Sequence, residues 1–124
     1  MTNELPAREA PVRALIFDMD GTIVDNMRFH DDAWESWHAG HGLPFDRATF
    51  FTNTAGMAVG EVVGPHFPNA DADEVARLAE AKEALYRETY RAHVTPLAGL
   101  LALMDRADAA GIPMAVASAA PPAN

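Results

Sequence analysis

The sequence predicts an α/β fold in which a parallel β-sheet is interrupted by a largely helical insert. Two short, nearly continuous apolar runs, residues 12–17 and 114–117, are typical of strands covered on both faces, as in a parallel sheet. Each run stops at a polar residue, Asp18 or Ser118. Much of the chain between the runs, residues 26–95, has mainly helical periodicity. This order indicates one α/β unit with a helical insertion.

Composition and charge narrow the classes of function. The chain has 124 residues, of which 49% are hydrophobic, and this fits one globular domain of ordinary size. Nine lysines and arginines stand against eighteen acidic residues, a net charge of -9 that argues against a nucleic-acid partner. The absence of cysteine excludes disulfides, thiolate metal sites and cysteine nucleophiles, so any metal must bind oxygen or imidazole.

The sequence contains no recognisable targeting segment. Residues 1–11 mix charged residues with prolines and lack the apolar run of a signal peptide. No apolar stretch is long enough to cross a bilayer. We therefore expect a cytoplasmic protein without a membrane partner.

The first strand ends in an acidic loop. Asp18 and Asp20, followed by Gly21, interrupt the apolar run, and glycine among polar residues is typical of a turn. Open α/β sheets bind their ligands at the carboxyl ends of the strands. We therefore expect a binding site at this loop.

The insert begins with an amphipathic helix that has an aromatic face. Apolar residues recur at helical spacing through residues 26–42. Trp34 and Trp37 could stack on a sugar, but aromatic residues at this spacing are more typical of a core, and we assign them there. His38 and His41 are one turn apart, as metal ligands often are. Without a third ligand nearby, we assign them to a solvated helix end.

The rest of the chain predicts further helices and the second strand. Glycines and prolines interrupt residues 45–68, which predict one or two short helices. A longer helix begins at Asp71 or Asp73, either of which can cap it, and ends near His93. Residues 96–111 contain another amphipathic helix, closed by a glycine.

The acidic loop carries a specific motif. Residues 17–25 read FDMDGTIVD and resemble the first motif, hhhDxDGTxxD, of the haloacid dehalogenase (HAD) superfamily. The MAVAS segment before Ala119 resembles the second motif, an apolar strand that ends in serine or threonine. The resemblance implies a Rossmann-like parallel sheet core, of which only two strands are present, with an inserted all-helical cap. Residues 12–25 and 96–124 would form the partial core, and residues 26–95 the cap.

The resemblance also assigns chemistry to the two aspartates. Asp18 would attack a phosphate monoester and form an aspartyl-phosphate intermediate. Asp20 would protonate the leaving alkoxide and later deprotonate water, acting as general acid and base. Asp18, together with the backbone carbonyl of Asp20, would bind Mg²⁺, a hard cation that relieves the repulsion between phosphate and carboxylates.

Other residues are assigned to the phosphate and the substrate. Gly21 would permit the sharp loop, while the Ser118 hydroxyl and the Ala119 N–H would hydrogen-bond the transferring phosphoryl group. His30 lies where β-phosphoglucomutase-like members of the superfamily carry a histidine at the start of the first cap helix. Lys82 lies roughly where they carry a cap lysine. The alternative for both is a solvent-facing position on an amphipathic helix.

These features favour a Mg²⁺-dependent phosphatase of a small phosphorylated metabolite of the sugar phosphate class. A β-phosphoglucomutase-like enzyme is the alternative, although the GMAV segment at residues 56–59 has no arginine to hold a second phosphate. The lysine of the third HAD motif and the acids of the fourth are absent, and two strands do not make a stable sheet. A catalytically silent N-terminal fragment, with strand residues such as Ile16 left in contact with water, is therefore a further hypothesis.

Overall fold

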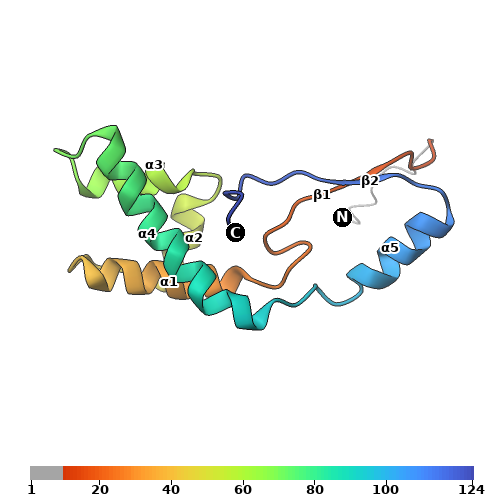
Figure 1. The fold of residues 1–124 in the computed structure, drawn as a ribbon, viewed down its shortest axis with the longest axis horizontal. Helices are drawn as coiled ribbons and strands as arrows, with labels where there is room; N and C mark the ends of the chain where they lie inside the picture. Colours follow the sequence, from red (N-terminus) through yellow and green to blue (C-terminus); the bar gives the residue numbers. More distant parts are fainter. Residues whose placement is uncertain (1–9) are drawn as a thin grey trace, which may run out of the picture.

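The computed structural model describes residues 10–124 and shows a small parallel sheet beside a group of packed helices (Figure 1). The segment before residue 10, where the sequence shows no apolar leader, lies outside the described residues. The elements in chain order are β1 (Leu15–Phe17), α1 (Met27–Gly40), α2 (Arg47–Thr54), α3 (Val59–Val63), the 3-10 turn η1 (Gly64–His66), α4 (Ala72–Tyr90), the 3-10 turn η2 (Arg91–His93), α5 (Leu100–Ala109) and β2 (Met114–Val116).

The two predicted strands are neighbours in one parallel sheet. Leu15 pairs with Met114 and Phe17 with Val116, and the connection between the strands carries every helix of residues 10–124. The strand β1 is shorter than the predicted run over residues 12–17, because the paired backbone begins where the Leu15 N–H donates to the Pro113 carbonyl at 3.0 Å. The predicted α/β order is confirmed.

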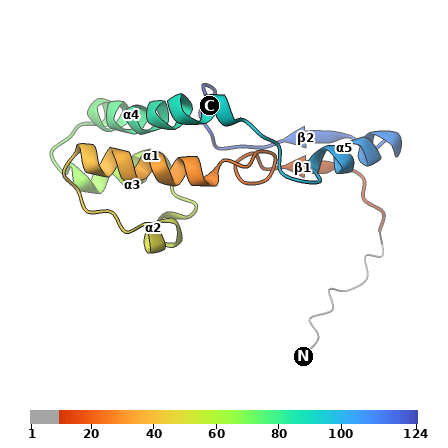
Figure 2. The same cartoon turned by 90° about the horizontal axis from the view of Figure 1, so that it is seen from below.

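The helical insert, residues 26–95, is built around two long helices. Helices α1 and α4 pack against each other and run in opposite directions (Figure 2). Helix α3 also packs against α4. Asp71 caps α4, since its carboxylate accepts a hydrogen bond from the Glu74 N–H at 2.8 Å. The helix ends predicted near residues 41 and 93 are confirmed within a few positions.

Aromatic side chains of α1 fill the core of the insert, as predicted. Trp37 is 1% exposed, and its indole N–H donates to the Leu78 carbonyl at 3.0 Å. Trp34 packs edge-on to it, with ring centroids 5.7 Å apart. The buried hydrophobic residues of the insert are Phe29, Ala33, Trp34, Trp37, Val62, Val63, Tyr86 and Tyr90. Both tryptophans therefore belong to the core.

The prediction of a solvated end at His38 is wrong. His38 is 2% exposed, and its Nδ1 lies 2.7 Å from the Trp34 carbonyl, to which it donates. The rings of Phe45, Phe50 and His66 lie 5.0 to 5.5 Å from its own ring. These aromatic groups cover the end of α1 because the segment before α2, α2 itself and η1 supply one ring each, which the periodicity of α1 alone does not predict.

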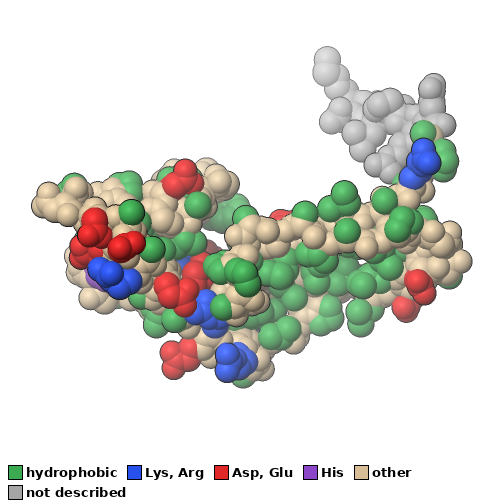
Figure 3. All heavy atoms as spheres, turned by 45° about the horizontal axis from the view of Figure 1, so that its top comes forward, with side chains coloured by type: hydrophobic (Ala, Val, Ile, Leu, Met, Phe, Trp, Pro, Cys, Tyr) green, Lys and Arg blue, Asp and Glu red, His purple; other side chains and the backbone are tan. Residues whose placement is uncertain are grey.

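The sheet and α5 leave apolar side chains uncovered within the described residues. Ile16 is 74% exposed and Val116 57% exposed, and Leu101 on α5 is also exposed. Figure 3 shows hydrophobic side chains gathered over this part of the molecule. The expectation that Ile16 remains in contact with water is confirmed. None of the helices within residues 10–124 combines the length and apolar character of a membrane span.

Candidate active site

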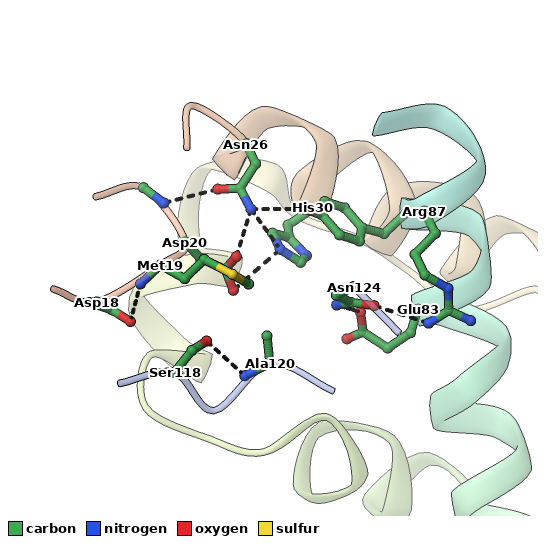
Figure 4. Close-up of polar contacts among 12 residues, drawn as sticks. Asp18, Met19, Asp20, Asn26, His30, Glu83, Arg87, Ser118, Ala120 and Asn124 are labelled. Carbon is green, nitrogen blue, oxygen red and sulfur yellow. Dashed lines mark hydrogen bonds and ion pairs between the residues drawn. The ribbon is translucent and has the colours of Figure 1, made fainter. Parts of the chain in front are cut away.

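Asp18 and Ser118 lie at the same edge of the sheet. Each follows the carboxyl end of its strand, and the Ala117 N–H still donates to the Phe17 carbonyl at 2.8 Å, so the two chains leave the sheet side by side. The Asp18 carboxylate accepts from the Met19 N–H at 2.8 Å. Both predicted residues are exposed, and Figure 4 shows their side chains at this edge. A phosphoryl group at the edge could therefore meet a carboxylate and a hydroxyl.

The loop after Asp18 is a tight turn that depends on Gly21. The Gly21 N–H donates to the Val24 carbonyl at 3.0 Å and to the Asn26 side chain at 2.9 Å. Gly21 has a φ of 68°, and an added Cβ would lie 3.0 Å from the Met27 side chain. Both the positive φ and this close approach favour glycine. Gly21 therefore shapes the loop through its backbone.

Asn26 is the buried centre of the loop. Its side chain is 0% exposed, and its amide donates to Asp20 at 2.7 Å and to the Tyr86 hydroxyl at 2.8 Å. The position just before α1 suggests a helix cap, but the side chain makes no capping bond and turns toward Asp20 instead. No local pattern marks Asn26 as a site residue, because its partner Tyr86 lies 60 positions away in the sequence.

His30 joins the loop to the insert. Its ring stacks on Tyr86, with centroids 3.8 Å apart, and its Nε2 lies 3.6 Å from an Asp20 oxygen. Its Nδ1 lies 3.0 Å from Nζ of Lys82. Because an ammonium has only donors, Nδ1 accepts this bond and the ring hydrogen of a neutral His30 sits on Nε2, facing Asp20. Lys82 is 2% exposed, so the solvent-facing alternative for it is wrong.

The surroundings of Asp20 favour its carboxylate form. The nearby His30 imidazole does most to lower the pKa of Asp20 below its ordinary value, and the Asn26 amide adds to this, while burial opposes both. An ionised Asp20 is suited to accept a proton. It can act as an acid only after it has received one.

The oxygen atoms available at this edge of the sheet are of the type that binds a hard cation. Carboxylate and carbonyl oxygens, as offered by Asp18 and Asp20, are the ligands that Mg²⁺ prefers. Residues 10–124 hold no group of three or more acidic, histidine or cysteine side chains placed to bind a metal. The two aspartates would therefore supply part of a shell that water and substrate oxygens also fill.

The structure divides the predicted site residues into two groups. Asp20 and His30 approach each other directly, with Asn26 between them. Asp18 and Ser118 share the sheet edge, and within residues 10–124 neither forms a hydrogen bond or ion pair with the other or with His30. Ala119 is exposed beside Ser118. Asp18 and Ser118 follow the strand ends, whereas Asp20 lies on the acidic loop next to His30 of α1 (Figure 4).

Comparison with known proteins identifies the family. Residues 12–124 match the model of the haloacid dehalogenase-like hydrolases. Hexitol phosphatase A of Escherichia coli strain K12 is 29% identical over 84% of this chain and 47% of its own. Protein CbbY of Rhodobacter capsulatus is 33% identical over 91% of this chain and 53% of its own. The chain belongs to the haloacid dehalogenase-like hydrolase family.

A solved structure supports the same fold. The β-phosphoglucomutase of Clostridium difficile superposes with a TM-score of 0.71 at 25% identity, over 89% of this chain and 52% of that one. The fold class is therefore a Rossmann-like parallel sheet core with an inserted helical cap, as predicted. The chain spans about half the length of the curated relatives it matches.

Proposed function

We propose that the full-length protein is a Mg²⁺-dependent phosphatase that hydrolyses small phosphate monoesters of the sugar phosphate class. The observation that carries the proposal is the exposed Asp18 carboxylate, which shares an edge of the parallel sheet with Ser118. The name of the relative hexitol phosphatase A supports a phosphorylated sugar or sugar alcohol as the substrate. We also propose a cytoplasmic location for the protein.

In the proposed reaction, an oxygen of Asp18 forms a bond to phosphorus as the ester P–O bond breaks. Asp20, once it has taken up a proton from solvent, gives that proton to the leaving alkoxide. Asp20 then takes a proton from water, whose oxygen attacks phosphorus and releases Asp18. The Ser118 hydroxyl and the Ala119 N–H hold the oxygens of the transferring group. Bound Mg²⁺ would supply positive charge that offsets the negative charges of phosphate and aspartate.

The helical insert, residues 26–95, would act as the cap, with residues 12–25 and 96–124 belonging to the core. Helices α1 and α4 bring His30 and Lys82 to the loop that carries Asp20. This placement supports a role for the insert in enclosing the substrate and excluding water. His30 would then contact the part of the substrate that carries the leaving oxygen.

A β-phosphoglucomutase-like mutase is the second candidate. The buried contact between His30 and Lys82 and the structural likeness to a β-phosphoglucomutase favour it. Against it, the segment that leads into α3, residues 56–59, offers no guanidinium for a second phosphate. We therefore favour hydrolysis.

One assay tests the proposal and separates the two candidates. The full-length protein is incubated with a panel of hexose and hexitol phosphates, with Mg²⁺ or with a chelator, and inorganic phosphate is measured. Phosphate release that the chelator abolishes is the expected result. Conversion of β-glucose 1-phosphate to glucose 6-phosphate, primed with a trace of the bisphosphate and without net phosphate release, would instead establish the mutase. No turnover of any phosphate monoester would reject both.

A further inference from the structure

Two neighbouring residues of α4, Lys82 and Glu83, are both buried. Lys82 is 2% exposed and Glu83 4% exposed. Consecutive residues of a helix point about 100° apart, so two different surfaces must cover them. Lys82 faces α1, where its Nζ contacts His30 and lies 4.9 Å from the ring centroid of Trp34. Glu83 faces Asn124, in the segment that follows β2.

Both carboxylate oxygens of Glu83 are occupied. One lies 3.2 Å from Nζ of Lys82, within the helical insert. The other accepts a hydrogen bond from the Asn124 amide at 2.6 Å, and the Asn124 oxygen accepts from Arg87 at 3.0 Å (Figure 4). Glu83 therefore links Lys82 to the loop formed by residues 118–124, which begins at Ser118.

Lys82 is the single lysine of the 124 residues, while all eight other basic residues are arginines. A lysine can lose its proton on burial, whereas an arginine does not. Burial lowers the pKa of Lys82, and the adjacent Glu83 carboxylate is the main group that opposes this. The carboxylates of Asp20 and Asp31 act in the same direction with smaller effect. Glu83 is therefore the principal counter-ion of the buried ammonium.

We propose that Glu83 is a positioning residue: it holds the Lys82 ammonium against His30 and, through Asn124, ties the loop of residues 118–124 to the helical insert. When the loop that carries Ser118 packs on α4, Asn124 holds Glu83 in place. Glu83 in turn keeps Lys82 in contact with His30. The effect of Glu83 on turnover rests on the proposed function. The contacts among Glu83, Lys82 and Asn124 do not depend on which phosphate ester is hydrolysed.

Turnover by the full-length protein tests the role of Glu83. Glu83→Gln should lower kcat about ten-fold or more, the effect of losing one charge-assisted hydrogen bond, with KM little changed. Because Glu83 acts through Lys82, the double variant with Lys82→Met should be no slower than Lys82→Met alone. Glu83→Asp, which keeps the charge, should recover part of the loss. Additive losses in the double variant would overturn the proposal, as would an equal loss in Glu88→Gln, a matched change at an exposed position of α4.

The link to the loop has its own test. Asn124→Ala should also lower kcat, and it should cause no further loss when Glu83 is already glutamine. A loss in Asn124→Ala that adds in full to that of Glu83→Gln would show that Asn124 acts separately, and would overturn this half of the proposal.

A measurement on the full-length protein that needs no turnover separates failure of this inference from failure of the proposed function. With lysine labelled at its side-chain nitrogen, the NMR signal that disappears in Lys82→Met is assigned to Lys82. Its pKa should fall by about one unit or more in Glu83→Gln and stay unchanged in Glu88→Gln. This result supports the inference even if no phosphate ester is hydrolysed. An unchanged Lys82 pKa in Glu83→Gln overturns it even in an active phosphatase.

Discussion

Nζ of Lys82 lies 3.0 Å from Nδ1 of His30, across a separation of 52 positions in the sequence. The contact brings α4 against the first turn of α1, and His30 in turn faces Asp20 across 3.6 Å. The helical insert therefore reaches the acidic loop through two buried or partly buried basic groups. Substitutions in this region should show which residues stabilise the acidic loop and the insert and which take part in turnover.

Asn26→Ala should destabilise the protein. The change removes the fully buried amide that donates to Asp20 and to the hydroxyl of the buried Tyr86 and that accepts from the Gly21 N–H. Unsatisfied buried polar groups of this kind cost about 1–3 kcal/mol in the free energy of unfolding. Denaturant unfolding measures the loss. Asn53→Ala, at an exposed site on α2, is the matched control and should stay within about 0.5 kcal/mol of the original chain. Equal stabilities of the two variants would contradict the central place of Asn26.

His38 should make the stability of the insert sensitive to acid. Burial lowers the pKa of His38 below its ordinary value of 6.5, and nearby His66 and His41 contribute in the same direction. The imidazole of His38 therefore binds a proton more readily in the unfolded chain than in the folded one. Its contribution to the free energy of unfolding is complete above about pH 6.5 and is lost as the pH falls toward the pKa in the folded state. One such proton contributes a slope of at most about 1.4 kcal/mol per pH unit.

Unfolding curves at several pH values between neutral and mildly acidic conditions check this. His38→Gln, which retains a donor for the Trp34 carbonyl, should flatten the dependence of the unfolding free energy on pH over this range. His93→Gln, at an exposed position, should leave it unchanged. The same slope in all three proteins would show that His38 titrates normally.

Asp20→Asn should slow turnover severely and leave ligand binding partly intact. An amide at this position can neither give a proton to the leaving group nor take one from water, and loss of general acid–base catalysis typically costs about 10²–10⁴-fold. The side chain retains a group that can pair with Asn26, so the loop keeps its shape. Steady-state kinetics and Mg²⁺-dependent binding of a phosphate analogue measure the two effects. A variant that binds no ligand would indicate that Asp20 has mainly a structural role.

The sequence predicts the order of the elements and the position of the acidic loop because these depend on local patterns. Apolar runs, helix caps such as Asp71, and the FDMDGTIVD motif each lie within a short stretch. The interior of the candidate site is not local in this way. Asn26 bonds to Tyr86 and Glu83 to Asn124, and both partners come from distant segments. In the sequence alone, a glutamate next to a lysine is typical of a solvent-facing position. The sequence of α1 predicts a solvated His38 for the same reason, since the rings that cover His38 come from the segment before α2, from α2 and from η1.

Asp18 is the proposed nucleophile, and the rest of the proposed reaction depends on this role. The most direct measurement is to react the full-length protein with a phosphate monoester that carries a labelled phosphoryl group, quench it in acid, and locate the label by peptide mapping. We expect the label on the peptide that contains Asp18, no label and no turnover in Asp18→Asn, and unchanged behaviour in Asp105→Asn, a matched control at an exposed position of α5. Turnover close to the original rate in Asp18→Asn, or a label on another residue, would contradict the role of Asp18 as the nucleophile.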